Sequence, residues 1–269
     1  MKEDFSKYNP EGSVLRKVQL RLLDMLIAVD TICRKNEIPY WIEYGTLLGA
    51  VRHGGFIPWD DDIDIAVMEK DYKRLRCALI KELPEQFVFQ DTTTDPYAFF
   101  YYGRVRDTKS YCYYPRFAKL KQQGLWLDIF RYTPYVSHRF RNLVDSLFRR
   151  AYHEKNHYGD VEYNSSIRKS VNKVIAYMIY PFTWAAKEFI EWLGKKTNSQ
   201  QLTRWDSHPR AIYKASNIFP LTEIEFEGHM FFAPGNWHEH LTGIYGDYMK
   251  VPPPEKREQI LDMNLVKFY

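Results

Sequence analysis

The spacing of apolar residues predicts three elements in the first part of the chain. Apolar side chains recur every three or four positions across residues 13–35, which predicts an amphipathic helix. They are Val14, Val18, Leu22, Met25 and Val29. A short strand is expected at residues 38–44. Gly45 and Thr46 then open a short helix that runs to about Arg52 and breaks at the Gly54-Gly55 pair.

The middle of the chain alternates between strand and helix patterns. Residues 62–68 are expected to form a strand, and residues 69–83 a helix that Pro84 stops. Two further strands are expected at residues 99–106 and 125–132. Residues 137–196 have a helical pattern, with an interruption around residues 158–166.

Short strands return in the last third, with a hairpin near residues 224–232 and a proline run at residues 252–254. Strands and helices are mixed without strict alternation, so the predicted class is α+β, a mixed β-sheet flanked by helices. No linker is visible. Residues 1–269 are therefore expected to form a single domain, in which residues 137–196 make a mostly helical insertion or second lobe.

Composition narrows the class of protein. Hydrophobic residues make up 45% of the chain and charged residues 27%, a globular mixture that can bury a substantial core. The formal net charge of +4 suits phosphate-bearing small molecules or an anionic membrane surface. Because no dense stripe of Lys and Arg accompanies it, this charge argues against nucleic acid as a partner.

The cysteines and the apolar stretches indicate the compartment. Cys33, Cys77 and Cys112 are widely separated and odd in number, which argues against a disulfide framework or a zinc ribbon. The polar N-terminus lacks the features of a signal peptide. Residues 174–186 are apolar but too short to span a membrane; a buried helix pair is favoured, and a helix on the membrane surface is the alternative. The expected location is the cytoplasm, free or peripheral at the inner membrane face.

The most informative segment contains four aspartates, Asp60, Asp61, Asp62 and Asp64. Asp62 and Asp64 stand in the apolar frame Asp-Ile-Asp-Ile-Ala-Val, and on a strand they would project to the same side. Asp is a poor strand former and neighbouring like charges repel, so this strand indicates a compensating cation or a functional site. Two such carboxylates can anchor one Mg²⁺, or two metals about 4 Å apart.

Two other interpretations of this segment were open. Asp60 and Asp61 fit a solvated turn as well as they fit a metal site. A calcium loop also places acidic residues at alternate positions, but it needs Gly where this chain has Ile65 and Glu where it has Asp71. The calcium loop is therefore excluded.

The turn at Gly45 and Thr46 is a candidate phosphate site. Free N–H groups and the helix dipole favour anions at a helix start, although a Thr cap alone is common. Together with the acidic strand that follows, this turn forms a more specific candidate site than either feature alone. Arg52 and His53 could then meet phosphate oxygens, Arg52 the more strongly because its guanidinium forks onto them.

Residues 45–65, with the Tyr-Trp-Ile-Glu-Tyr sequence of residues 40–44, closely resemble the LicD family of phosphocholine transferases. They also resemble the related fukutin and fukutin-related group, within the nucleotidyltransferase-fold superfamily. The superfamily signature is a Gly-Ser or Gly-Thr turn followed by an Asp-hydrophobic-Asp strand. The resemblance continues at Leu-Asp-Ile-Phe (127–130) and at Tyr-Gly-Asp-Tyr-Met (245–249), which Pro252 and Pro253 follow. The chain departs from it in having Thr46 where many members have Ser, in a longer gap to Asp62, and in residues 137–196, which match no motif.

The resemblance implies a nucleotidyltransferase-like fold and transfer of a phospho-alcohol from a CDP-linked donor, such as CDP-choline. The acceptor would be a hydroxyl of a glycan or glycolipid, such as lipopolysaccharide, and CMP would be released. It implies that Asp62, Asp64 and Asp128 are catalytic residues and ligands of Mg²⁺ or Mn²⁺, with Asp128 alternatively the base for the acceptor hydroxyl. The candidate substrate-binding residues are Gly45, Thr46, Arg52, His53, Trp59 and Arg104.

Phosphoryl transfer depends on alignment and on neutralising the charge of the phosphate oxygens, and this agrees with the residues present. A metal on Asp62 and Asp64 would supply Lewis acidity. Arg104 and Arg106 stand on the strand before Asp128, where they would face the pyrophosphate or be solvated edge charges.

Rival functions have weaker support. His153, Glu154 and His157 fit the H-E-x-x-H zinc-peptidase motif, but the polar surroundings favour an exposed helix end. His238 and His240 are expected to be a surface pair. An enzyme of the same fold that transfers a nucleoside monophosphate to a small molecule shares the aspartate pair and stays open. The three aspartates argue against a binding module without catalysis, and the weak basic character against a polymerase.

Overall fold

The computed structural model describes residues 4–136, 139–156, 166–205 and 211–269. The first elements are α1 (Val14–Lys35), β1 (Tyr40–Ile42), α2 (Tyr44–His53), β2 (Asp64–Met68), α3 (Glu69–Glu82) and β3 (Phe87–Gln90). They are followed by β4 (Gly103–Asp107), β5 (Ser110–Cys112), β6 (Trp126–Pro134), α4 (Arg139–Lys155) and α5 (Ser166–Lys196). The last are β7 (Gln201–Thr203), β8 (Ile212–Lys214), α6 (Ala215–Ile218), β9 (Thr222–Phe226), β10 (His229–Ala233), α7 (Trp237–Tyr245) and β11 (Val266–Phe268).

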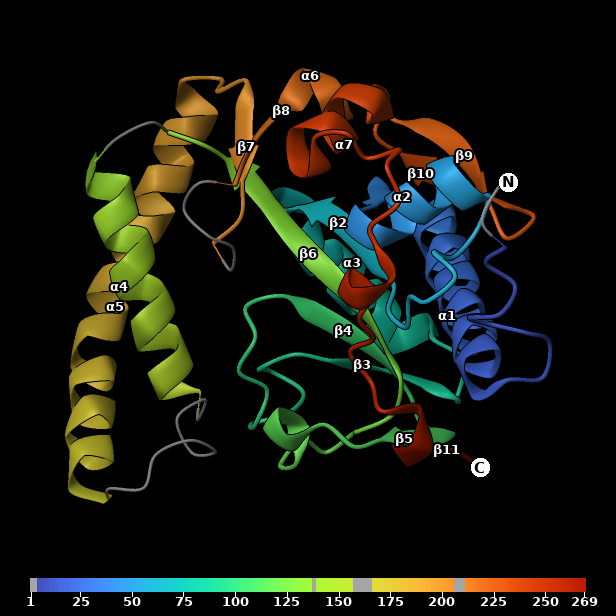
Figure 1. The fold of residues 1–269 in the computed structure, drawn as a ribbon. Helices are drawn as coiled ribbons and strands as arrows, with labels where there is room; N and C mark the ends of the chain where they lie inside the picture. Colours follow the sequence, from blue (N-terminus) through green and yellow to red (C-terminus); the bar gives the residue numbers. More distant parts are fainter. Residues whose placement is uncertain (1–3, 137–138, 157–165, 206–210) are drawn as a thin grey trace.

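The centre of the molecule is a mixed sheet with the strand order β1-β2-β6-β4-β3 (Figure 1). Strand β2 runs parallel to β6, and the other neighbours in this order are antiparallel. β7 pairs with the end of β6, and β8 with β7, while β9-β10 and β5-β11 form two small separate sheets. The α+β class expected from the sequence is confirmed.

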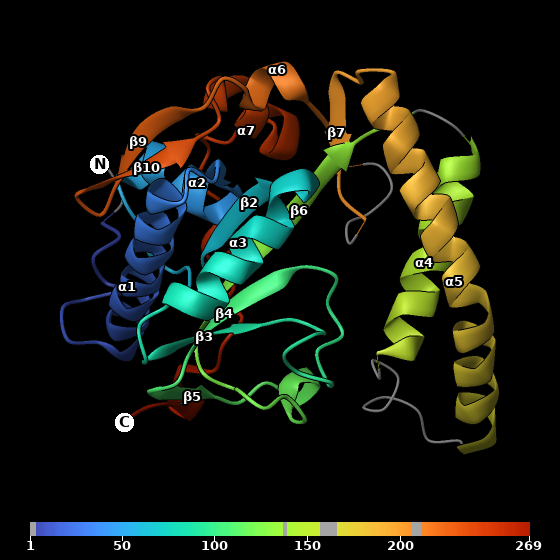
Figure 2. The same ribbon diagram turned by 180° about the vertical axis from the view of Figure 1, so that it is seen from behind.

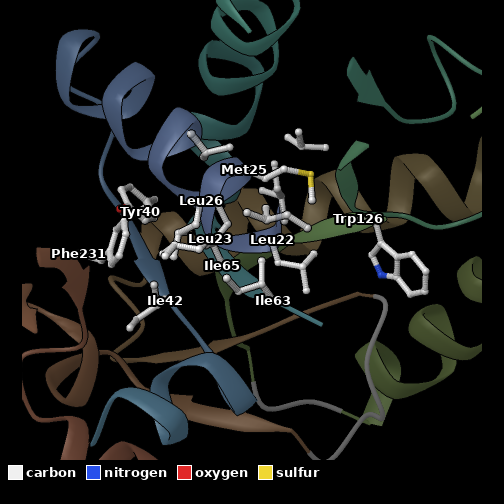
Figure 3. Close-up of a cluster of buried hydrophobic side chains, with 14 of the residues drawn as sticks. Leu22, Leu23, Met25, Leu26, Tyr40, Ile42, Ile63, Ile65, Trp126 and Phe231 are labelled. Atoms are coloured by element: carbon white, nitrogen blue, oxygen red, sulfur yellow. The ribbon is translucent and has the colours of Figure 1, made fainter. Parts of the chain in front are cut away.

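Helices α1 and α3 cover one face of this sheet (Figure 2). Ser13 caps α1, its side chain accepting a hydrogen bond from the Arg16 N–H. The buried side of α1 carries Leu22, Met25 and Leu26, which lie against Ile63 and Ile65 in one apolar cluster (Figure 3). Burial of such side chains is the main favourable term in folding, so this layer holds β2 in place.

The other face of the sheet is polar at its centre. Register pairs Asp64 of β2 with Asp128 of β6, and Asp128 with Arg104 of β4. Residues paired across adjacent strands project from the same face of a sheet. Three charged side chains from three strands therefore form one row, which we call the charged row.

Helices α4 and α5 form a hairpin beside the sheet (Figure 1). Phe148 and Tyr152 of α4 and Ile190 of α5 pack with Tyr101 and Trp205 in a cluster of their own. Both helices confirm the helical pattern expected for this region, whereas residues 157–165 lie outside the described part of the chain. Among the described helices, none is both long and apolar enough to cross a membrane.

Most long elements agree with the predicted ones to within two residues, but the predicted strand at residues 99–106 starts only at Gly103. The aromatic residues before it pack on one another and on Phe117 instead of pairing with a strand. Strand β3 was not predicted. Residues 87–90 have the composition of a strand but are only four residues long.

The α1 layer generates a first prediction. Leu22→Ala should lower the free energy of unfolding by about 2–5 kcal/mol, because it leaves a cavity under the sheet. Leu20, on the same helix, is 39% exposed, so Leu20→Ala is the matched control and should cost less than about 0.5 kcal/mol. Urea unfolding measures both. Equal losses would contradict the packing described here.

Candidate active site

The aspartates of β2 and β6 crowd negative charge at one end of the charged row. Asp64 and Asp128 are buried, and Asp62 lies half-buried just before β2. Burial, and then repulsion from Asp62 and Asp128, raises the pKa of Asp64 well above its usual value. Burial, and then repulsion from Asp61 and Asp128, raises the pKa of Asp62 to about 7. Such uncompensated negative charge favours the binding of a cation.

The pair Asp62 and Asp64 has the donor chemistry of a hard divalent ion. No three His, Cys, Asp or Glu side chains in the described ranges are arranged as a ready metal cage. Mg²⁺ commonly takes one or two protein carboxylates and completes its shell with water and substrate phosphates. The two aspartates therefore fit Mg²⁺ or Mn²⁺, and the three-ligand set that includes Asp128 stays a prediction.

Asp128 differs from the other two because an arginine neutralises it. Arg104 Nε donates to Asp128 Oδ1 at 2.5 Å, and Arg104 Nη2 donates to Oδ2 at 3.3 Å. Burial alone would lower the pKa of Arg104, but Asp128 and Tyr102 together outweigh it and the pKa is raised. Nη1 of Arg104 has no hydrogen-bond partner among the described residues, so one donor is left for a ligand.

Arg104 and Arg106 are both buried, so the expectation of solvated edge charges is wrong for each. Arg106 Nε donates to Gln90 Oε1 and Nη1 donates to the Gly124 carbonyl, each at 2.8 Å. Its contacts connect β4 to neighbouring segments. Arg104 is therefore the arginine of this strand that belongs to the site.

The turn at the start of α2 lies directly against the acidic residues. Thr46 Oγ1 accepts a hydrogen bond from the Asp64 N–H at 2.8 Å, which ties the turn to β2. A Cβ added to Gly45 would lie 2.8 Å from Asp60 Oδ2, so glycine permits this close approach. The side chain of Glu43, the residue before the helix, makes no capping bond. The first N–H groups of α2 have no partner within the helix and are suited to bind phosphate oxygens.

Asp60 and Asp61 have different roles, which their sequence positions did not reveal. Asp60 faces a cleft beside the turn, and burial and then repulsion from Asp62 raise its pKa. Asp61 accepts hydrogen bonds from the N–H groups of Ile260 (3.1 Å) and Leu261 (2.6 Å). Asp61 therefore anchors the C-terminal segment, and the solvated-turn interpretation is wrong for it.

The cleft beside the turn has a volume of about 350 Å³ and brings the predicted sequence blocks together. One wall comes from residues 45–60 and the other from residues 245–252. The lining residues are Gly45, Leu48, Arg52, Ile57, Trp59, Asp60, Tyr245, Asp247, Tyr248, Lys250 and Pro252. Gly45, Arg52 and Trp59, which were predicted to bind substrate, thus line the same cleft, and Lys250 adds a second positive charge.

The expected role of His53 as a phosphate contact needs correction. Arg52 Nε donates to His53 Nε2 at 3.0 Å, so this nitrogen must be unprotonated. Burial and then the Arg52 charge lower the pKa of His53 to about 4. The ring packs edge-on against Phe5 and Trp59. A neutral imidazole offers no positive charge to a phosphate, so His53 supports Arg52 and Trp59 instead.

Glu43 and His240 form a buried pair that the sequence did not predict. His240 is buried on α7 rather than on the surface, and its Nε2 lies 2.7 Å from Glu43 Oε1. With Glu43 ionised, His240 Nε2 donates this bond, and Trp41 Nε1 donates to the other carboxylate oxygen. These bonds hold the residue just before α2. No local pattern could reveal the bond between Glu43 and His240, because 197 positions separate them.

Tyr44 and Arg204 were also missed. Tyr44, the first residue of α2, has a φ of +47°, which is rare for a non-glycine residue and is found at functional turns. Its hydroxyl shares hydrogen bonds with those of Tyr213 (2.8 Å) and Tyr132 (3.2 Å). The guanidinium of Arg204 lies 3.9 Å from the centre of the Phe130 ring. Its positive charge lowers the pKa of Asp64 and so opposes the burial and the neighbouring carboxylates, which raise it.

The zinc-peptidase motif is not part of this site. His153 and Glu154 lie on α4 of the helical hairpin, and His157 lies outside the described residues.

Comparison with known proteins agrees with this geometry. Residues 37–158, which hold the turn, the aspartate pair and Asp128, match the nucleotidyltransferase domain described as LicD/FKTN/FKRP. Residues 37–158 of this chain therefore match a domain of the LicD family.

Relatives in the LicD family differ in how much of the chain they cover. The lipopolysaccharide cholinephosphotransferase LicD of Haemophilus influenzae is 27% identical over 255 residues, covering 91% of this chain and 94% of that protein. The ribitol 5-phosphate transferase FKRP of Homo sapiens is 53% identical over 34 residues, 13% of this chain and 7% of that protein. An uncharacterized protein of Rickettsia prowazekii, RP689, is 48% identical over 69 residues, 26% of this chain and 24% of that protein.

The neutral state of His53 leads to a prediction about pH. Because folding lowers its pKa from about 6.5 to about 4, the unfolded chain binds more protons between these values, and stability falls as the pH drops through this range. His53→Gln keeps an acceptor for Arg52 but does not titrate. From pH 7.5 to pH 5, the free energy of unfolding should fall by about 1 kcal/mol less in this variant than in the wild type, after allowance for solvent screening. Urea unfolding at the two pH values tests this, with the exposed His229→Gln as control; parallel losses would contradict it.

The Glu43–His240 pair leads to another prediction. His240→Ala should lower the free energy of unfolding by about 1–3 kcal/mol, because Glu43 stays buried with one donor fewer. His240→Gln can restore a donor and should cost less. The exposed Thr242→Ala on the same helix is the control. If all three variants unfold at the same urea concentration, the pair does not stabilise the start of α2.

Proposed function

We propose that this chain transfers a phospho-alcohol, such as phosphocholine, from a CDP-linked donor to a hydroxyl of a glycan or glycolipid, releasing CMP. The observation that carries the proposal is that the start of α2 is bonded to Asp64 through Thr46 and also borders, at Gly45, a cleft that contains Arg52 and Lys250. Such a site combines carboxylates that can bind a cation with hydrogen-bond donors and positive charges that can bind a pyrophosphate.

The names of the relatives support the same class of reaction. The Haemophilus protein is named as a cholinephosphotransferase acting on lipopolysaccharide, and the human protein as a transferase of ribitol 5-phosphate. Both names describe the transfer of an alcohol that carries phosphate. We extend that class of reaction to this chain. A screen of CDP-alcohols identifies which alcohol is transferred.

In the proposed reaction, the acceptor oxygen attacks the phosphorus that bears the alcohol, and the bond to the CMP oxygen breaks. Asp128, oriented by Arg104, is the carboxylate assigned to accept the acceptor's proton. Mg²⁺ or Mn²⁺ held by Asp62 and Asp64 would supply Lewis acidity to the phosphate oxygens. The N–H groups at the start of α2, Arg52 and Lys250 would align the pyrophosphate and neutralise its charge.

The cleft also has groups suited to the rest of the donor. The rings of Trp59, Tyr245 and Tyr248 line it together with the carboxylate of Asp247. Aromatic faces next to a carboxylate attract quaternary ammonium groups and can stack on a base. The cleft therefore suits a cationic alcohol such as choline.

The donor is tested by incubating the protein with CDP-choline, CDP-ribitol, CDP-glycerol or nucleoside triphosphates, with and without Mg²⁺ or Mn²⁺ and a candidate glycan acceptor. Mass spectrometry should show CMP and a phospho-alcohol-modified glycan from one CDP-alcohol, only with metal. If a triphosphate yields pyrophosphate and a nucleotide-modified product instead, the alternative nucleotidyltransferase activity is correct and the proposed reaction is wrong.

The same assay tests the aspartates. Asp64→Ala and Asp62→Ala should each lower turnover by at least about a thousandfold. Each removes a proposed ligand of the metal that would neutralise the phosphate charge. The exposed Asp24→Ala on α1 is the control and should keep full activity. Circular dichroism checks the fold of each variant. A folded Asp64→Ala variant with wild-type turnover would exclude the metal-ligand role.

A further inference from the structure

Helix α5 carries an apolar stripe that the rest of the described chain leaves uncovered. The stripe consists of Val171, Val174, Ile175, Met178, Phe182, Phe189 and Trp192, all largely exposed. Phe182 is 77% exposed and Met178 67%. At about 100° per residue these positions fall on one side of the helix, so the stripe is continuous.

The stripe lies opposite the side of α5 that packs against the protein. Ala176, Thr183, Lys187 and Ile190 are buried and fall on the other side of the same helix. Residues buried in the hairpin and residues exposed on the stripe thus alternate with the helical period. A surface helix of a globular protein normally has polar residues on its outer side, so this helix departs from that pattern.

Helix α4 widens the apolar surface. Leu143 and Leu147 of α4 are exposed, and Leu147 lines a shallow groove of about 240 Å³ with Ile175 and Ile179 of α5. The exposed Arg150 stands at the same groove. The apolar surface thus belongs to the hairpin as a whole, which stands at one side of the molecule (Figure 1).

The charges near the stripe identify what would cover it. Lys195 and Lys196 are exposed at the C-terminal end of α5, and Lys173 lies near its other end. No Asp or Glu occurs in α5 before Glu188, which is paired with Lys187 at 3.1 Å. An apolar stripe with aromatic rings and basic ends complements an anionic lipid surface. The sequences of α4 and α5 contain eleven Lys and Arg against four Asp and Glu, so an anionic lipid surface suits this hairpin better than a second, equally basic copy.

We propose that the α4–α5 hairpin docks on an anionic bilayer. Helix α5 would lie in the plane of the membrane surface, with its apolar stripe inserted in the interface. The apolar side chains would lie at the boundary between headgroups and acyl chains, and the lysines would contact lipid phosphates. This goes beyond the proposed reaction, because docking requires only the hairpin. If the proposed reaction is also correct, docking would bring a membrane-anchored acceptor towards the site, since β6 carries Asp128 and continues towards the hairpin.

The test is cosedimentation of the full chain with vesicles. The wild type should pellet with vesicles of equal parts phosphatidylglycerol and phosphatidylcholine, and less with phosphatidylcholine alone. Met178→Glu/Phe182→Glu should weaken binding by at least about tenfold, and Lys195→Glu/Lys196→Glu should weaken binding to the anionic vesicles alone. Ile80→Glu on α3, at a residue that is 52% exposed outside the hairpin, is the matched control and should bind like the wild type.

Two further measurements keep the proposal falsifiable. Hydrogen exchange of the wild type should slow in α5 when anionic vesicles are added, a readout that does not depend on whether any variant folds. Light scattering without lipid should show a monomer. A wild type that stays in the supernatant with both kinds of vesicle would overturn the proposal. So would a lipid-free dimer that Met178→Glu/Phe182→Glu converts to a monomer, because the stripe would then be a contact between copies. CMP release is measured separately, so docking and the proposed reaction can fail independently.

Discussion

The parallel pairing of β2 with β6 is the interaction on which the site depends. It puts Asp64 beside Asp128 on one face of the sheet, where burial and repulsion disfavour the charge of Asp64. The structure offsets part of this cost with Arg104, which binds Asp128, and Arg204, which acts on Asp64. The charge of Asp62 and Asp64 that remains is what the proposed divalent cation would neutralise.

The start of α2 depends on contacts made from distant parts of the chain. Thr46 binds the backbone of β2, Glu43 is held by His240 of α7, and Tyr44 by Tyr213 of β8. These bonds fix the position of the turn, and a turn held in place in this way would lose less entropy if it binds the proposed donor. The C-terminal third therefore contributes to the site, although the match to the family domain covers only residues 37–158.

Local sequence patterns predicted the elements with strong periodicity and the residues whose chemistry conflicts with their surroundings. Helix α1 followed from its apolar spacing, and Asp62 and Asp64 were evident because carboxylates are rare in an apolar strand. The shortest strands were harder to predict, because three or four residues carry little periodic signal. Asp61 was ambiguous for another reason, since its partners lie about two hundred residues away.

The sequence by itself determined the class of the fold, the resemblance to the LicD family and the aspartate pair, because each depends on periodicity or on a contiguous motif. Only the tertiary structure decided that Arg104 neutralises Asp128, that His53 is neutral, that His240 is buried on Glu43, and that one side of α5 is left uncovered. The physical reason is that charge state and burial depend on neighbours in space. Most of those neighbours come from other elements of the fold, at distances along the chain that no local pattern records.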